Sequence, residues 1–122
     1  MPRVAPTILV ADDNDELRSV VAETLREAGY EVLEAASGEE ALRLPHENLA
    51  LIVADIIMPP EGGIALVDAL KARVAGLKVL FISGYGAMNG RSAQVDPVLG
   101  KPFSADELLR RVAELVPEAR SR

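Results

Sequence analysis

The chain has 122 residues, of which 49% are apolar and 26% are charged, which suits one compact domain and is too short for two. It contains no cysteine, which excludes disulfides and thiolate metal sites, and no apolar run approaches the ~20 residues of a membrane-spanning helix. The net charge of -6 and the aromatic content of 3% argue against a nucleic-acid surface, so we expect a cytoplasmic domain that binds neither nucleic acid nor membrane.

Short apolar runs alternate with amphipathic segments from the start of the chain. Residues 7–11 form an apolar run that ends at Asp12, and this run predicts a buried strand. The apolar stretch is too short to be a signal peptide. Apolar residues then recur at helical spacing from Asn14 to Gly29, and glycine commonly follows the last turn of a helix. Residues 30–35 predict a second strand.

The same alternation continues through the middle of the chain. The pattern Ser37-x-x-Glu40 predicts a capping box that starts a second helix, which ends before Pro45. A third strand is expected over residues 50–54. After a turn rich in proline and glycine, apolar spacing predicts a third helix over residues 64–72.

The last part of the chain holds two more expected strands. A fourth strand is predicted over residues 78–82, whereas residues 84–94 are weakly patterned, so any helix there is short. Residues 97–99 predict a brief last strand, and Ser104-x-x-Glu107 is a capping box that starts a final amphipathic helix.

Five strands that alternate with helices predict an α/β fold in which a doubly wound parallel sheet is covered on both faces, with right-handed crossovers. We expect a single domain over residues 1–122, with an ordered core over about 5–117. In such sheets, functional groups gather beyond the carboxyl ends of the strands. The predicted strand ends carry these polar residues: Asp12, Asp13, Asp55, Ser83 and Lys101.

These five residues suit phosphoryl transfer when they are taken together. Three carboxylates at one edge would repel one another unless a cation sat among them, and Mg²⁺ is a hard ion that prefers oxygen ligands. Lys101 and the Ser83 hydroxyl would then hold phosphoryl oxygens. A carboxylate can itself be the nucleophile, and Asp55 is central in the row.

Taken singly, each of these residues has an ordinary structural explanation. An acidic pair after a strand is often a helix N-cap, and Asp55 could be a turn residue. Lys101 before a proline is usually a solvated lysine, and Ser83 before a glycine is usually a turn residue. Their joint position at four strand ends favours a functional site.

The chain resembles a receiver domain of the two-component response regulators. The pieces that carry the resemblance occur in the family's order along the whole chain: "ILVADDN", "AGYEVLEAASGEEAL", "VADIIMPPEGG", "LFISGYG" and "GKPFSADEL". The resemblance implies a flavodoxin-like (βα)5 fold with a five-stranded sheet in the order 2-1-3-4-5. It also implies a phosphoprotein of a phosphorelay.

The resemblance implies a role for each matching residue. Asp55 would accept a phosphoryl group from a sensor histidine kinase or a phosphotransfer protein. Asp13 would bind Mg²⁺ directly and Asp12 would bind it through water, with Asp55 and the backbone carbonyl of Ile57 as further ligands. Ser83 and Lys101 would bind the phosphoryl oxygens and pass the signal to a surface for a downstream protein, formed by the segment 84–94, the last strand and the final helix. The chain would catalyse only its own phosphorylation and dephosphorylation, so it is not expected to be an enzyme in the usual sense.

Two features depart from the family's pattern. Val98 stands where typical receivers carry a Tyr or Phe, and the segment 84–100 is several residues shorter than usual, which predicts a shortened fourth helix. One alternative is therefore a degenerate receiver that binds proteins without phosphorylation. Another is a small phosphotransferase or phosphatase, although the chain has no glycine-rich phosphate loop and no second general acid.

Overall fold

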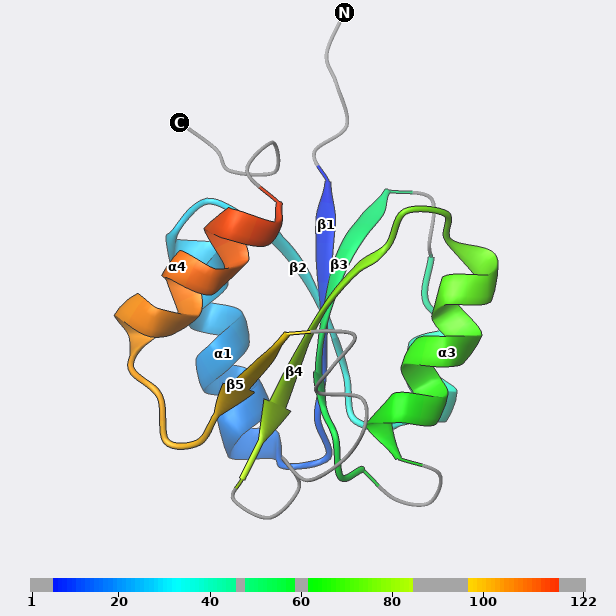
Figure 1. Cartoon of the computed structure of the whole chain (residues 1–122), viewed down its shortest axis with the longest axis horizontal. Coiled ribbons are helices and arrows are strands. Elements are labelled where there is room, and N and C mark those ends of the chain that lie inside the picture. Colours follow the sequence, from blue (N-terminus) through cyan, green and yellow to red (C-terminus); the bar gives the residue numbers. More distant parts are fainter. Residues whose placement is uncertain (1–5, 46–47, 59–61, 85–96, 117–122) are drawn as a thin grey trace, which may run out of the picture.

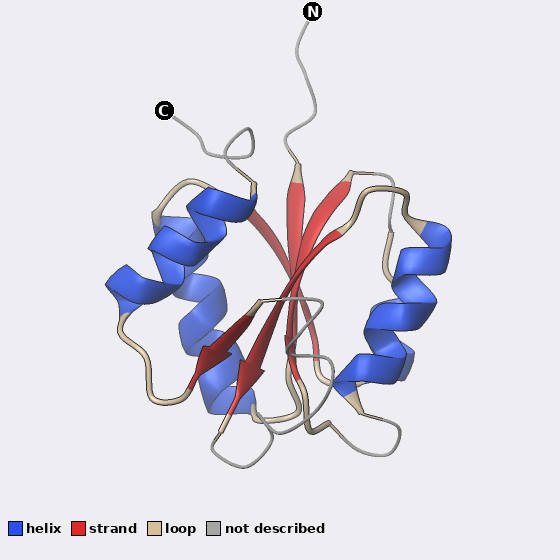
Figure 2. Cartoon of the chain, in the orientation of Figure 1, coloured by secondary structure: helices blue, strands red, loops and turns tan. Residues whose placement is uncertain are grey.

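The computed structural model describes residues 6–45, 48–58, 62–84 and 97–116. These residues form a five-stranded parallel sheet in the order β2-β1-β3-β4-β5, with helices packed on both faces (Figure 1, Figure 2). The strands are β1 (Thr7–Ala11), β2 (Glu31–Ala35), β3 (Leu49–Asp55), β4 (Lys78–Ser83) and β5 (Val98–Gly100). The helices are α1 (Asp15–Glu27), α2 (Gly38–Arg43), α3 (Gly63–Arg73) and α4 (Ala105–Leu115).

The predicted α/β class, the parallel sheet and the strand order 2-1-3-4-5 are confirmed. The helix labelled α4 is the predicted final helix. A shortened helix is predicted within residues 84–94; all of these except Gly84 lie outside the described residues, so this helix stays a prediction. In the described part of the chain, no helix is both long enough and apolar enough to span a membrane.

Successive residues of each strand point to opposite faces of the sheet, and each face has its own apolar cluster. In β3, Leu51 and Val53 belong to the cluster that includes apolar residues of α1 and α4. Ile52 and Ala54 belong to the cluster that includes apolar residues of α2 and α3. Figure 1 shows the same division, with α1 and α4 on one side of the sheet and α3 on the other. Burial on both faces explains why the strands are nearly continuous apolar runs.

Side-chain hydrogen bonds cap the first turns of α1, α2 and α4. The Asn14 side chain caps α1 by accepting a hydrogen bond from the Leu17 N–H at 3.0 Å. At α4, Ser104 and Glu107 form the predicted reciprocal capping box. At α2, Ser37 accepts from the Glu40 N–H as expected, but the Glu40 carboxylate accepts from the Ala36 N–H and not from Ser37. The predicted box at α2 is therefore only half correct.

Three strands, β3, β4 and β5, end one residue later than predicted from the sequence. Asp55 is the last residue of β3 and lies in register with Ile82, and Ser83 is the last residue of β4 and lies in register with Gly100. Both polar residues are therefore held by the sheet itself, which positions their side chains more firmly than a loop would.

Candidate functional site at the carboxyl edge of the sheet

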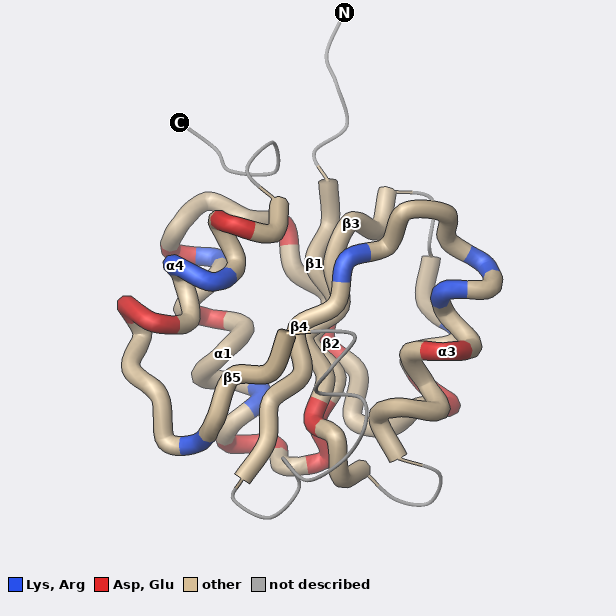
Figure 3. Tube along the Cα trace, in the orientation of Figure 1, with Lys and Arg blue, Asp and Glu red and all other residues tan. Residues whose placement is uncertain are grey.

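The carboxyl ends of β1, β3 and β4 meet at one edge of the sheet, where acidic positions gather in Figure 3. Asp12, Asp13 and Asp55 each offer a carboxylate oxygen there, and the three oxygens lie within 4.8 Å of one another. Lys101 follows β5 and reaches the same place, since its Nζ lies 3.2 Å from Asp55 Oδ2. The structure thus brings together four of the five polar groups that the strand ends predict.

Asp12 is buried, with 2% of its surface exposed. Its Oδ1 accepts a hydrogen bond from the Asn14 N–H at 2.9 Å. Its Oδ2 has no hydrogen-bond partner, and among the described residues it is the single buried side-chain oxygen or nitrogen in that position. A buried carboxylate oxygen without a partner is costly, so this atom is expected to meet a ligand from outside the chain.

Burial raises the pKa of Asp12 above its ordinary value, and the negative charges of Asp55 and Asp13 raise it further. The hydrogen bond from Asn14 and the positive charge of Lys101 act in the opposite direction and do not cancel the rise. The direction of this shift reports crowded negative charge, which a bound cation would relieve.

A consequence for stability follows from the raised pKa of Asp12. The folded protein binds the Asp12 proton more tightly than the unfolded chain does, so the contribution of this group to stability is fully present below the unfolded pKa of 3.8 and is lost as pH rises through the folded pKa. We therefore expect the free energy of unfolding, measured with urea in EDTA, to fall relative to that of Asp12→Asn as pH rises through this window. A difference between the two proteins that does not change with pH would contradict this expectation.

Asp55 is held at the end of β3 by two contacts. Its Oδ1 accepts a hydrogen bond from the Ile57 N–H at 3.0 Å, and its Oδ2 accepts from Lys101 Nζ. Asp55 is buried, with 8% of its surface exposed, and it is the last residue of β3, at the carboxyl edge of the sheet. A carboxylate that is fixed in direction at the end of a strand is suited to act as a nucleophile.

Ser83 and Lys101 are joined through their backbones. The Lys101 N–H donates to the Ser83 carbonyl at 2.7 Å, which couples the end of β4 to the residue that follows β5. Ser83 is buried, and its hydroxyl donates to the neighbouring Gly84 carbonyl at 2.7 Å. The hydroxyl therefore lies at the end of β4, but its proton is donated to the adjacent peptide carbonyl. The peptide bond between Lys101 and Pro102 is cis.

The turn between β3 and α3 brings backbone close to Asp55. Gly62 has a φ of 97°, a conformation that favours glycine, and its N–H donates to the Met58 carbonyl. Gly63 begins α3 against the Asp55 carbonyl, where an added Cβ would overlap the carbonyl oxygen. Pro59, which belongs to the proline- and glycine-rich turn predicted after the third strand, lies outside the described residues. Ile57, whose carbonyl is a predicted metal ligand, has 65% of its surface exposed beside this turn.

One polar residue near the site, Arg18, is not indicated by the sequence pattern. Arg18, on α1, donates from its guanidinium to the backbone carbonyl of Asp12 at 2.9 Å. Its position alone gives only a weak signal: a long basic side chain near the start of the helix after the acidic pair can lean back toward the preceding strand.

The acidic group fits a hard divalent cation. Three carboxylates with one unpartnered buried oxygen match the oxygen ligands and the charge that Mg²⁺ requires. The ammonium of Lys101 lies beside the same group and can hold an anionic ligand, such as a phosphoryl group.

The chain is similar to known proteins in both its sequence and its structure. The family model described as the response regulator receiver domain matches residues 8–113. The chain is 37% identical to the transcriptional regulatory protein PrrA of Mycobacterium tuberculosis over 92% of this chain and 50% of PrrA. It is 31% identical to the response regulator receiver protein CpdR of Brucella abortus over 89% of this chain and 95% of CpdR.

A solved structure of the receiver domain from the hybrid histidine kinase CckA superposes with a TM-score of 0.76. The two sequences are 36% identical, and the match covers 90% of this chain and 98% of that domain. The chain spans about half the length of several transcriptional regulators that it matches, and 12% of a matching sensor kinase.

Proposed function

The chain belongs to the response regulator receiver family, and from this premise we propose that it is the phosphoacceptor module of a two-component phosphorelay. The observation that carries the proposal is the position of Asp55, which is fixed at the end of a buried strand between the acidic pair and Lys101. The donor would be a phosphohistidine of a sensor kinase or a phosphotransfer protein, in keeping with the kinase name of one relative, CckA.

In the proposed reaction, an Asp55 carboxylate oxygen attacks the phosphorus atom of the donor. A P–O bond forms and the P–N bond to the donor imidazole breaks, with its electron pair leaving on the imidazole nitrogen. Asp55 Oδ1 stays oriented by the Ile57 N–H. Lys101 Nζ, which pairs with Oδ2 before transfer, then holds a phosphoryl oxygen.

Asp12, Asp13, Asp55 and the Ile57 carbonyl are the groups that would hold Mg²⁺, which would neutralise charge on the carboxylates and on the phosphoryl oxygens when bound. We expect the module to act only on its own phosphoryl group and not to turn over an external substrate, because the proposed set includes no second general acid. The signal would pass from Ser83 and Lys101, through their shared backbone hydrogen bond, to the surface of β5 and α4.

The test is phosphorylation with acetyl phosphate, followed by intact mass. We expect one phosphoryl group per chain in the presence of Mg²⁺ and none in EDTA, because the crowded carboxylates repel an anionic donor without a cation. The product should be labile to hydroxylamine, as an acyl phosphate is. Absence of label with Mg²⁺ would instead favour the degenerate receiver that binds proteins without phosphorylation. Repeated hydrolysis of excess acetyl phosphate at enzymatic rates would favour a phosphatase.

A further inference from the structure

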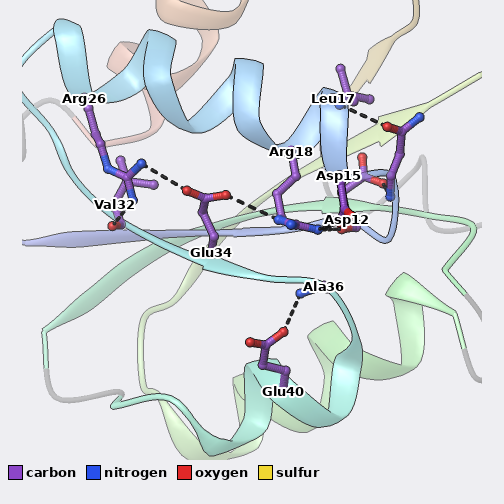
Figure 4. A network of polar contacts seen from close by, with 10 residues as sticks. Asp12, Asp15, Leu17, Arg18, Arg26, Val32, Glu34, Ala36 and Glu40 are labelled. Carbon is purple, nitrogen blue, oxygen red and sulfur yellow. Dashed lines mark hydrogen bonds and ion pairs between the residues drawn. The ribbon is translucent and has the colours of Figure 1, made fainter.

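Arg18 connects α1 to the backbone of the acidic pair. It is the fourth residue of α1, and its side chain is 16% exposed. Side chains on a helix lean toward its N-terminus, so the guanidinium extends back past the first turn. There it donates from Nη1 to the Asp12 carbonyl at 2.9 Å, as the close view in Figure 4 shows.

The guanidinium of Arg18 is itself fixed by two carboxylates. Arg18 Nε lies 3.3 Å from Glu34 Oε1 on β2, and Arg18 Nη1 lies 2.8 Å from Asp15 Oδ1. Burial lowers the pKa of Arg18, but the hydrogen bonds with Asp15 and Glu34 outweigh this and raise it, so the side chain stays protonated. Its charge is matched locally by these carboxylates, and its contact with Asp12 is to the backbone.

Glu34 is in turn fixed by a second arginine. Arg26 Nη1 lies 3.0 Å from Glu34 Oε2, and Arg26 Nη2 donates to the Val32 carbonyl at 3.0 Å. Glu34 therefore lies between two arginines of α1, as Figure 4 shows, and only Arg18 of the two donates to Asp12. The chain thus offers two side chains of one type that share a partner and differ in their contact with the site.

Asp12 is held from three directions as a result. Its N–H donates to the Ala35 carbonyl at 3.1 Å, its carbonyl accepts from Arg18, and its Oδ1 accepts from the Asn14 N–H. With the backbone held on both sides and Oδ1 bound to the Asn14 N–H, Oδ2 is left without a partner among the described residues. Loss of the Arg18 contact would free the Asp12 carbonyl and the turn that follows it.

We propose that Arg18 is a positioning residue for Asp12: through the Asp12 carbonyl it fixes the direction of the carboxylate and thereby the affinity of the acidic group for Mg²⁺. The inference rests on the proposed function for the metal, while the positioning of Asp12 can be measured without it. Groups that orient metal ligands typically change metal affinity by about 10- to 100-fold when they are removed.

The test compares Arg18→Met with Arg26→Met, because methionine keeps an apolar stem and removes every donor. By calorimetric titration, we expect Mg²⁺ affinity to fall about 10-fold or more in Arg18→Met and to stay within about twofold of the wild type in Arg26→Met. Arg18→Lys should give an intermediate value, because one ammonium cannot reproduce the forked contacts. Equal losses in both methionine variants, or no loss in either, would overturn the proposal.

A second measurement needs no metal. Hydrogen exchange of the Asn14 amide reports on the Asp12 carboxylate, since this amide donates to Asp12 Oδ1. In EDTA we expect exchange about threefold faster or more in Arg18→Met and unchanged in Arg26→Met. If the wild type binds no Mg²⁺, the proposed function fails, and this measurement alone decides the role of Arg18. Unchanged exchange in Arg18→Met would overturn it.

Discussion

Substitution of Asp55 by asparagine is expected to abolish phosphorylation of the chain by acetyl phosphate in the presence of Mg²⁺. The amide oxygen can still accept the Ile57 N–H that orients the carboxylate, but an amide is not a nucleophile for phosphorus and cannot form the covalent intermediate. Removal of a nucleophile leaves no partial route, so we expect the initial rate of labelling to fall by at least ~10³-fold. The rate is measured by intact mass over time.

The matched control for this substitution is Asp68→Asn, which makes the same chemical change at an exposed position on α3. This variant should be labelled at the wild-type rate. Circular dichroism should show that both variants keep their helices and strands, since asparagine has nearly the volume of aspartate. Continued labelling of Asp55→Asn would mean that the phosphoryl group is carried by another residue, and the assignment of Asp55 would be wrong.

Alanine at Gly63 is expected to destabilise the fold more than any other single methyl group discussed for this chain. A Cβ at this position would overlap the Asp55 carbonyl oxygen and lie 2.9 Å from its carbon, and both atoms belong to the backbone of β3. Relief requires α3 to move away from the sheet, which we expect to cost about 3 kcal/mol or more. Total stabilities of domains are only ~5–15 kcal/mol. Urea unfolding followed by circular dichroism measures the loss.

Gly100→Ala is the control for Gly63→Ala. An added Cβ at Gly100 meets no atom within 4 Å and the backbone there has no positive φ, so the change in stability should stay within about 1 kcal/mol. The gain in helix propensity from alanine at Gly63 is at most ~1 kcal/mol and does not offset the collision. Equal unfolding midpoints for the two variants would show that α3 can shift freely at its first turn.

The fold was predictable because its strands are apolar runs separated by helices with clear start signals. Ser104 and Glu107 form the capping box that their spacing indicates. The end of α1 was also predictable, since Gly29, with a φ of 103°, follows the last turn and donates to the Arg26 carbonyl. The last residues of β3 and β4 were not predictable, because pairing of Asp55 and Ser83 depends on the neighbouring strand and not on the local sequence.

The gathering of Asp12, Asp13 and Asp55 was predictable from a rule about parallel sheets, which places all carboxyl ends at one edge. Individual hydrogen bonds were not. The Ser83 hydroxyl donates to the next carbonyl, a choice that rotation of one bond decides. Arg18 shares the pattern of an ordinary solvated helix residue, and only the packing of α1 against β1 and β2 reveals its contact with the Asp12 carbonyl.

The long stretch of sequence between Asp55 and Lys101 has a consequence for how the site forms. Neighbouring parallel strands must be joined by long crossovers. Asp55 and Lys101, which form an ion pair, are therefore 46 positions apart in the sequence. Contacts so distant in sequence form late, and the N-terminal part of a chain leaves the ribosome first. The carboxylates that follow β1 and end β3 are therefore synthesised well before their lysine, and we expect the site to be completed late in folding.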